Sequence, residues 1–144
     1  MTALVDTNVL VYRFDPRDSA KQRIARELLR DGMEHGTLRV SHQAIVEFFQ
    51  AVTRPISRNA GAVLPRPDAL RETEELLAQF EILYPTESLL RSAIRAVATY
   101  QLNWLDAHMW AYAEHYGLEE ILSEDFSDGQ LIGTVRIRNP FKTA

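Results

Sequence analysis

The sequence contains no cysteine, which excludes disulfide bonds, cysteine nucleophiles and thiolate metal sites. It also lacks the GxxxxGK[ST] and GxGxxG loops that bind nucleotide phosphates, and the GxSxG turn of serine hydrolases. No two of its four histidines have the HExxH spacing of a zinc protease. The sequence therefore gives no signal for a nucleotide site, a serine hydrolase or a zinc protease.

Long apolar runs are missing as well. No stretch approaches the roughly 18 apolar residues of a membrane span. The apolar run from Leu4 to Val11 is broken by Asp6 and Asn8, and no basic leader precedes it. We therefore expect a cytoplasmic protein that neither enters a membrane nor is exported.

Lysine is scarce, because fourteen of the sixteen basic residues are arginine and only Lys21 and Lys142 are lysine. Arginine binds phosphate and carboxylate well, although the codon preference of a high-GC genome is the simpler explanation. The net charge of −4 argues against a protein that coats nucleic acid through bulk charge. With 144 residues, 46% of them hydrophobic, and no internal repeat, the chain is expected to form a single domain over residues 1–144.

Short apolar segments alternate with segments of helical period. Strands are predicted at 3–5, 38–40, 81–84, 120–122 and 135–138, and helices at 8–12, 17–35, 42–53, 67–79, 86–100 and 104–116. This alternation predicts an α/β fold, a three-layer α/β/α sandwich with a mostly parallel central sheet. A loop of about a dozen residues, 55–67, contains several prolines and arginines and is long enough to suggest a function.

Asp6 directly follows the predicted buried strand at 3–5. In open α/β sheets, ligands bind outside the carboxyl ends of the strands, so Asp6 is a candidate site residue. Aspartate is also a common N-cap, and a helix is predicted to begin just after it. Position alone favours neither role.

Asp106 shares a helical face with Leu102, Met109, Trp110 and Ala113. A carboxylate on such a face is expected to point toward the core, where an unpaired charge is costly. This favours a partner, a metal or a site for Asp106. The alternative is that Asp106, three residues after the predicted cap Asn103, stabilises the first turn of its helix.

Two further acids are less clearly marked. Asp125 lies just past the strand at 120–122, as Asp6 lies past its own strand, but a polar turn explains it too, and Glu124 and Asp128 compete for any role. The helical neighbours of Glu47 are polar or small, so periodicity favours a solvent-exposed side chain there. A functional role for Glu47 requires instead that this polar helix face lines the cleft, which would place Gln43, Gln50 and Arg54 near the substrate.

The ordered set of these acids resembles the PIN domain family. The matching motifs are Asp6 in Val-Asp-Thr-Asn, Glu47 in Ala-Ile-Val-Glu-Phe, Asp106 in Trp-Leu-Asp-Ala and Asp125 in Leu-Ser-Glu-Asp-Phe. The chain length is similar to that of the stand-alone VapC-type ribonuclease toxins. The resemblance implies that these four acids are catalytic and bind Mg²⁺ or Mn²⁺, with Asp128 as an alternative fourth ligand. It also implies supporting roles for Thr7, Asn8 and Ser123.

The resemblance further implies a metal-dependent endoribonuclease that hydrolyses phosphodiester bonds in RNA and is the toxin of a toxin–antitoxin pair. Its expected partners are the RNA substrate, a cognate antitoxin and a second copy of the chain. Arg13, Arg54 and Arg58 are the candidates for binding the RNA backbone. Two alternatives stay open at this point: a non-catalytic PIN-like module that binds RNA or protein, and a structure-specific DNA nuclease.

Overall fold

A computed structural model describes residues 2–142 of the chain. Its six strands are β1 (Ala3–Val5), β2 (Leu38–Ser41), β3 (Glu81–Leu83), β4 (Glu120–Leu122), β5 (Leu131–Ile132) and β6 (Val135–Arg138). Its six helices are α1 (Thr7–Tyr12), α2 (Ser19–His35), α3 (His42–Thr53), α4 (Arg66–Gln79), α5 (Glu87–Tyr100) and α6 (Trp104–His115). None of these helices combines the length and the apolar character needed to cross a membrane.

The strands form one sheet in the order β3-β2-β1-β4-β6-β5. Every neighbouring pair is parallel except β5 and β6, so the predicted mostly parallel sheet is confirmed. Val5 at the end of β1 is in register with Val40 of β2 and Leu122 of β4. The sequence reading missed β5, because two residues are too short to display the alternating period of a strand.

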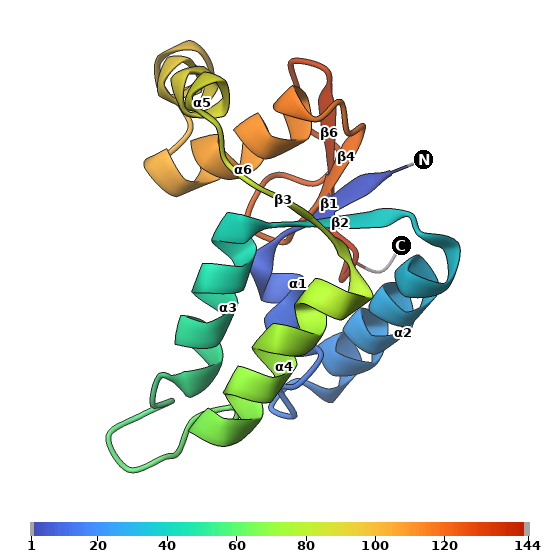
Figure 1. Cartoon of the computed structure of the whole chain (residues 1–144), viewed down its shortest axis with the longest axis vertical. Helices are drawn as coiled ribbons and strands as arrows, with labels where there is room; N and C mark the ends of the chain where they lie inside the picture. The colour runs from blue at the N-terminus through green and yellow to red at the C-terminus, as the bar shows by residue number, and fades with distance from the viewer. Residues whose placement is uncertain (1, 143–144) are drawn as a thin grey trace.

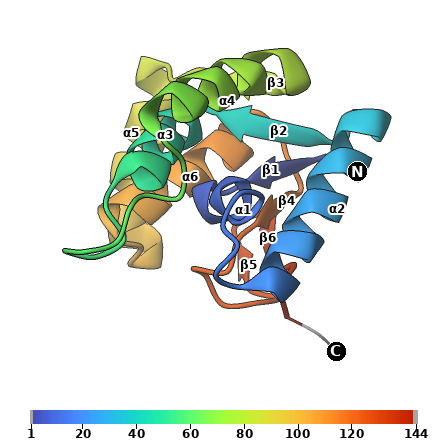
Figure 2. The same ribbon diagram turned by 90° about the horizontal axis from the view of Figure 1, so that it is seen from below.

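Helices cover both faces of this sheet. In Figure 1, α5 and α6 lie on one side of the strands, and α2 and α4 lie on the other. Figure 2 shows α2 running along its face of the sheet beside the adjacent strands β1, β4 and β6. Helix α6 contacts β1, β4 and β6, whereas α2 contacts β2. The predicted three-layer α/β/α sandwich is therefore confirmed.

The helix boundaries follow from local capping chemistry. Asp18, Ser41, Thr86 and Asn103 each accept a hydrogen bond from a backbone N–H in the first turn of the helix that follows. Gly36 has a φ of 65° and ends α2, as its position after a helical pattern predicts. The four N-caps determine where their helices begin, and Gly36 determines where α2 ends and the chain turns toward β2.

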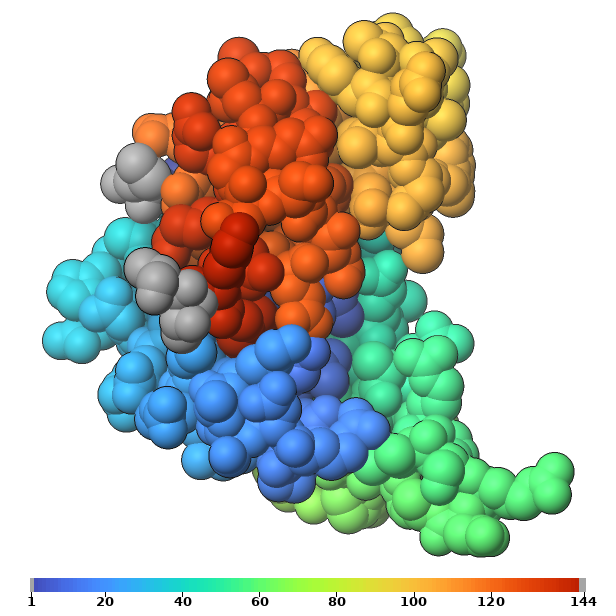
Figure 3. Space-filling model, turned by 180° about the vertical axis from the view of Figure 1, so that it is seen from behind, coloured from blue at the N-terminus to red at the C-terminus, as the bar shows by residue number. Residues whose placement is uncertain are grey.

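The proline-rich segment between α3 and α4 is a narrow projecting hairpin. A β-bridge joins Ser57 to Ala60, and the amide of Ile56 donates to the carbonyl of Gly61 over 3.0 Å. Arg58 therefore lies at the tip of the hairpin. Figure 3 shows the segment extending beyond the body of the protein.

Candidate active site

Asp6 lies where the central strands β1 and β4 end. Its amide donates to the carbonyl of Leu122 over 3.0 Å, and its side chain is only 7% exposed. The Thr7 amide donates to its Oδ1 over 2.7 Å, and the Ser123 hydroxyl donates to its Oδ2 over 2.6 Å. Asp6 is thus the N-cap of α1 and also a buried carboxylate at the carboxyl edge of the sheet, the place that its predicted role as a site residue requires.

The surroundings of Asp6 disfavour its ionised form. Burial is the main cause, and it raises the pKa of Asp6 from 3.8 to about 6. The hydrogen bonds from Ser123 and Thr7 oppose this rise, whereas the nearby carboxylates of Asp125 and Glu47 add to it. The structure therefore brings three of the candidate acids close enough for their charges to interact.

Glu47 of α3 contacts α1 through a threonine. The Thr7 hydroxyl donates to Oε1 of Glu47 over 2.7 Å, and Gln43 donates to Oε2 over 3.3 Å. The Glu47 side chain is half-buried, so the solvent-exposed position predicted from periodicity is wrong. The reason is that α1 packs beside α3, and the polar face of α3 lines the site instead of facing bulk water.

Asp106 joins the same group from the first turn of α6. Burial is the main cause that raises the pKa of Asp106, and the charges of Asp125 and Glu47 raise it further. Asn103 accepts from its amide and donates to its carboxylate, both over 2.8 Å. Asp106 therefore also has the local helix-start role considered from the sequence.

The core-facing position predicted for Asp106 is wrong, because its side chain is only half-buried, in the first turn of the helix. After Asp106, the apolar residues of α6 are buried around most of its circumference, so no single face marks the core. The buried set consists of Ala107, Met109, Trp110, Ala111, Tyr112 and Ala113.

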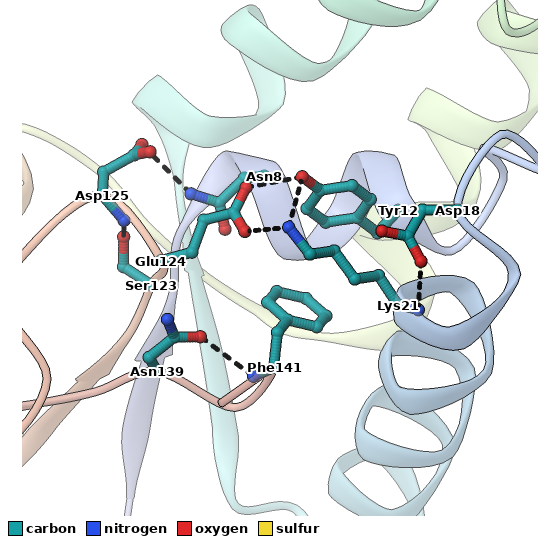
Figure 4. Close-up of polar contacts among 9 residues, drawn as sticks. All are labelled: Asn8, Tyr12, Asp18, Lys21, Ser123, Glu124, Asp125, Asn139 and Phe141. Atoms are coloured by element: carbon teal, nitrogen blue, oxygen red, sulfur yellow. Dashed lines mark hydrogen bonds and ion pairs between the residues drawn. The ribbon is translucent and has the colours of Figure 1, made fainter. Parts of the chain in front are cut away.

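The three acids that follow β4 have different partners. Glu124 accepts from Tyr12 and Lys21, as Figure 4 shows. Asp128 accepts from the amide of Asn139 over 2.8 Å. Asp125 instead accepts from Asn8 over 3.0 Å, and its charge raises the pKa values of Asp6 and Asp106. Asp125 is therefore the one of the three that joins the other candidate acids.

We call Asp6, Glu47, Asp106 and Asp125 the acidic group. Among residues 2–142, no three of its carboxylates have oxygen atoms that all lie within 4.8 Å of one another. The carboxylates are therefore neighbours, not a closed metal cage. Asp31, Glu34 and His35 of α2 do meet that distance, but they lie together on the exposed surface near the end of that helix.

The chemistry of the acidic group fits a hard divalent cation. Its charged donors are carboxylate oxygens, which suit Mg²⁺ or Mn²⁺, and bringing negative charges together favours a cation between them. The Oδ1 atom of Asn8 is buried and has no hydrogen-bond partner in the described part of the chain. A buried polar atom without a partner next to the acids is consistent with an additional polar ligand at this place.

The three arginines predicted to bind substrate lie in different environments. Arg54 and Arg58 are exposed at the end of α3 and on the projecting hairpin. Arg13 is half-buried, and its guanidinium donates to Gln79 of α4 over 3.1 Å. Burial lowers the pKa of Arg13 from its usual value. The structure therefore makes Arg13 a packing residue between helices.

Sequence reasoning missed Lys21. Its Nζ atom donates to Oε2 of Glu124 over 2.7 Å and lies over the rings of Tyr12 and Phe141. The partner is 103 positions away in the sequence, and an ordinary lysine in the first turn of a helix gives no local signal of such a contact.

The sequence model of the PIN domain family matches residues 3–127 of the chain. The matched residues include the central strands β1 and β4 and all four members of the acidic group. The chain belongs to the PIN domain family. No curated protein sequence matches it.

Several solved structures have a similar fold. A chain from a toxin–antitoxin complex of Klebsiella pneumoniae is 20% identical, with a TM-score of 0.70 over 99% of this chain and 100% of that one. VapC20 of Mycobacterium tuberculosis, described as a toxin that cleaves the sarcin–ricin loop, is 15% identical, with a TM-score of 0.66 over 86% of this chain and 90% of its own. A chain of VapBC2 from Rickettsia felis, bound to promoter DNA, is 12% identical, with a TM-score of 0.69 over 96% and 98%. At these identities the likeness establishes the fold.

Proposed function

We propose that this single PIN domain is a metal-dependent endoribonuclease and the toxin of a toxin–antitoxin pair. The observation that carries the proposal is that four carboxylates lie beside one another at the carboxyl edge of the sheet. They come from the N-cap of α1, from α3, from α6 and from the loop after β4. Family membership and the similarity to chains from toxin–antitoxin complexes support it. The structural similarity to VapC20, which is described as a toxin that cleaves the sarcin–ricin loop, supports RNA as the substrate.

In this proposal Asp6, Glu47, Asp106 and Asp125 hold Mg²⁺ or Mn²⁺. When bound, such an ion neutralises charge on the scissile phosphate and promotes ionisation of the attacking water. The side chains around the acids fix their orientation: Ser123 holds Asp6, Thr7 holds Glu47 and Asn8 holds Asp125. Both oxygens of Asp6 and both oxygens of Glu47 already accept a hydrogen bond, so a metal would use their remaining lone pairs. Asp125 accepts from Asn8 through Oδ2 and has its Oδ1 atom available within the described residues.

The substrate path proposed here starts at the acidic group and runs along α1 and α3 toward the projecting hairpin. Two adjoining hollows, of about 300 and 260 Å³, share Val11, Arg17 and Ala51. The first hollow is lined by Thr7 and Asn8 of the site, and the second by Arg54, Pro55, Ile56 and Val63. Arginine side chains beside an acidic site can bind the phosphates of single-stranded RNA, whose backbone the acids themselves repel. Arg54 and Arg58 fit this role, and Arg13 does not.

The partners follow from the same proposal. An antitoxin is the expected protein partner, because several structurally similar chains come from toxin–antitoxin complexes. A homodimer is expected through an exposed apolar surface on α5 and α6 that includes Leu90, Trp104 and Leu105. These residues line a cavity of about 540 Å³. An exposed apolar surface of this kind is typical of a protein–protein contact.

The decisive experiment compares Asp6→Asn and Asp106→Asn with the wild type in cleavage of a mixed single-stranded RNA pool, with Mn²⁺ and with EDTA. We expect cleavage by the wild type only with Mn²⁺, and a loss of at least about 100-fold in each variant, as for removal of a group that stabilises the transition state. Asp31→Asn changes an exposed acid far along α2 and is the matched control.

Full activity of Asp6→Asn, or cleavage that persists in EDTA, would overturn the proposal. A wild type that binds RNA without cutting it would identify a binding module instead. Cleavage of DNA but not RNA would identify a DNA nuclease. Circular dichroism of each variant shows that it is folded.

A further inference from the structure

A polar and aromatic cluster joins the loop after β4 to helices α1 and α2. The cluster consists of Tyr12, Lys21, Glu124 and Phe141, and we call it the Lys21 clasp. Tyr12 donates its hydroxyl to Oε1 of Glu124 over 2.6 Å, and Lys21 donates to Oε2 of the same carboxylate over 2.7 Å. Both oxygens of Glu124 are therefore held from one side, by residues more than 100 positions earlier in the chain (Figure 4).

The aromatic rings of Tyr12 and Phe141 pack against this ion pair. Tyr12 and Phe141 meet edge to face with ring centroids 4.9 Å apart, and the Lys21 ammonium lies 4.9 Å from the Tyr12 centroid and 5.8 Å from that of Phe141. Such an arrangement shields the ion pair and adds cation–π attraction. The Lys21 and Glu124 side chains are accordingly only 33% and 22% exposed. A pair shielded in this way is less screened by salt than a fully exposed one.

Phe141 lies outside the part of the chain that matches the family model, which ends at residue 127. The backbone of the tail is nevertheless anchored next to the site. The Phe141 amide donates to the side chain of Asn139 over 2.9 Å, and the Asn139 amide donates to Asp128 over 2.8 Å. The tail thus packs on the same loop that carries the acidic group's last member.

The residue after Glu124 is Asp125, which is itself exposed. Its own contacts are few: its amide donates to the Ser123 hydroxyl over 3.0 Å, and its carboxylate accepts from Asn8 over 3.0 Å. An exposed loop residue held by two hydrogen bonds is readily displaced when its neighbours are free to move. Glu124, fixed on α1 and α2, restricts this motion from the adjacent position.

We infer that the ion pair of Lys21 and Glu124, packed against Tyr12 and Phe141, positions Asp125 against Asn8. Asp125 then completes the acidic group for metal binding. The inference rests on the proposed function for the role of the metal, although the holding of the loop stands on the contacts alone. Lys21, Tyr12, Glu124 and Phe141 are positioning residues in this inference, because they act on the metal site through Asp125.

The test compares the wild type with Lys21→Met, which keeps the aliphatic chain and removes the charge. Arg91→Met is the matched control, since Arg91 forms an ion pair with Glu87 on α5, 3.0 Å long, without contact to the loop. A charge-reversed double variant, Lys21→Glu with Glu124→Lys, tests whether the pair itself is responsible. Amide hydrogen exchange of segment 123–129 is measured without metal, and Mn²⁺ binding is measured by calorimetry without RNA.

In Lys21→Met we expect exchange of segment 123–129 to accelerate and the dissociation constant for Mn²⁺ to rise, each by about fivefold, the size expected for loss of a partly exposed ion pair. Arg91→Met should leave the exchange rate of segment 123–129 and the affinity for Mn²⁺ unchanged. The double variant should restore each of these two quantities at least halfway to its wild-type value. Unchanged exchange of the segment in Lys21→Met, or an equal acceleration over the whole chain, would overturn the inference.

The two proposals fail in different ways. If the wild type neither binds Mn²⁺ nor cleaves RNA, the proposed function is wrong, while the exchange measurement still decides whether the Lys21 clasp holds the loop. If the wild type is active and Lys21→Met matches it in exchange and in Mn²⁺ affinity, the clasp is wrong and the function stands.

Discussion

The Ser123 hydroxyl donates to the Asp6 carboxylate over 2.6 Å, although the two residues are 117 positions apart. Each follows the last residue of a central strand, β1 for Asp6 and β4 for Ser123, and the two strands are parallel and in register. The serine is fully buried, so this hydrogen bond forms without competition from water. It also favours the ionised form of a carboxyl that burial would otherwise keep protonated.

Ser123→Ala removes this donor and is therefore expected to raise the pKa of Asp6 above about 6. The acidic limb of the pH profile of RNA cleavage should move to higher pH. At pH 7 we expect activity to fall by about tenfold, the size associated with loss of one hydrogen bond to a charged group. Ser88→Ala, at an exposed position of α5, is the control and should leave the profile unchanged. An unshifted acidic limb in Ser123→Ala would contradict this role for the serine.

Asp6→Asn should stabilise the metal-free protein at neutral pH. The folded state binds the Asp6 proton more tightly than the unfolded state, because its pKa is about 6 instead of 3.8. The resulting stabilisation is fully present below pH 3.8 and is lost as the pH rises through about 6. Asparagine carries no charge. Asp6→Asn should therefore have a free energy of unfolding about 1–2 kcal/mol higher than that of the wild type at pH 7.5 in EDTA.

Urea unfolding at pH 7.5 and pH 4 measures this effect. The gain of Asp6→Asn over the wild type should shrink at pH 4, where the wild-type carboxyl is largely protonated. The control Asp31→Asn, at an exposed position, should show no such dependence. A variant that is equally stabilised or destabilised at both pH values would argue against the raised pKa.

Arg54→Ala and Arg58→Ala should weaken RNA binding without slowing the chemical step. Both side chains are exposed. Arg54 lines the second hollow of the proposed substrate path, and Arg58 lies at the tip of the hairpin toward which that path runs. We expect each substitution to raise KM about threefold and to reduce the slope of log affinity against log salt by about 0.7–1, with kcat unchanged. Filter binding to single-stranded RNA over a range of salt concentrations measures the slope.

Arg13→Ala separates substrate contact from packing. Because the Arg13 guanidinium donates to Gln79 and is half-buried, its loss should lower the free energy of unfolding by about 1 kcal/mol and leave the salt slope of RNA binding unchanged. If Arg13→Ala instead reduced the salt dependence of RNA binding and left the stability unaltered, Arg13 would be a substrate-binding residue.

Gly32 in α2 has no room for a side chain. A Cβ atom there would lie 2.1 Å from Cδ1 and 2.3 Å from Cγ of Leu38, the first residue of β2. Gly32→Ala should therefore lower the free energy of unfolding by about 1–3 kcal/mol despite the better helix propensity of alanine. Gly61→Ala is the control, because nothing lies within 4 Å of its added Cβ. Thermal melting distinguishes the two, and equal stability would show that Leu38 moves aside freely.

Local signals along the sequence are sufficient to predict the helices and strands and their alternation. Caps such as Ser41 and Asn103, the stop at Gly36 and the short apolar strands are local signals, and they were sufficient to predict a mostly parallel sheet between helices. Asp6 was also identified by a local signal, a charged residue directly after a buried strand. Periodicity and capping act over a few residues, so one chain segment is enough to read them.

The surroundings of Glu47 and the choice among the acids after β4 depend on tertiary contacts, which periodicity does not predict. Glu47 lies on a polar helix face, and only the packing of α1 beside α3 makes that face the lining of the site through Thr7. The three acids after β4 are distinguished only by their tertiary contacts. Glu124 binds Lys21 and Asp128 binds the Asn139 amide, whereas Asp125 binds Asn8 and lies beside Asp6. These relationships join residues 11 to 117 positions apart. They depend on how parallel strands bring their carboxyl ends to one edge, which no local pattern records.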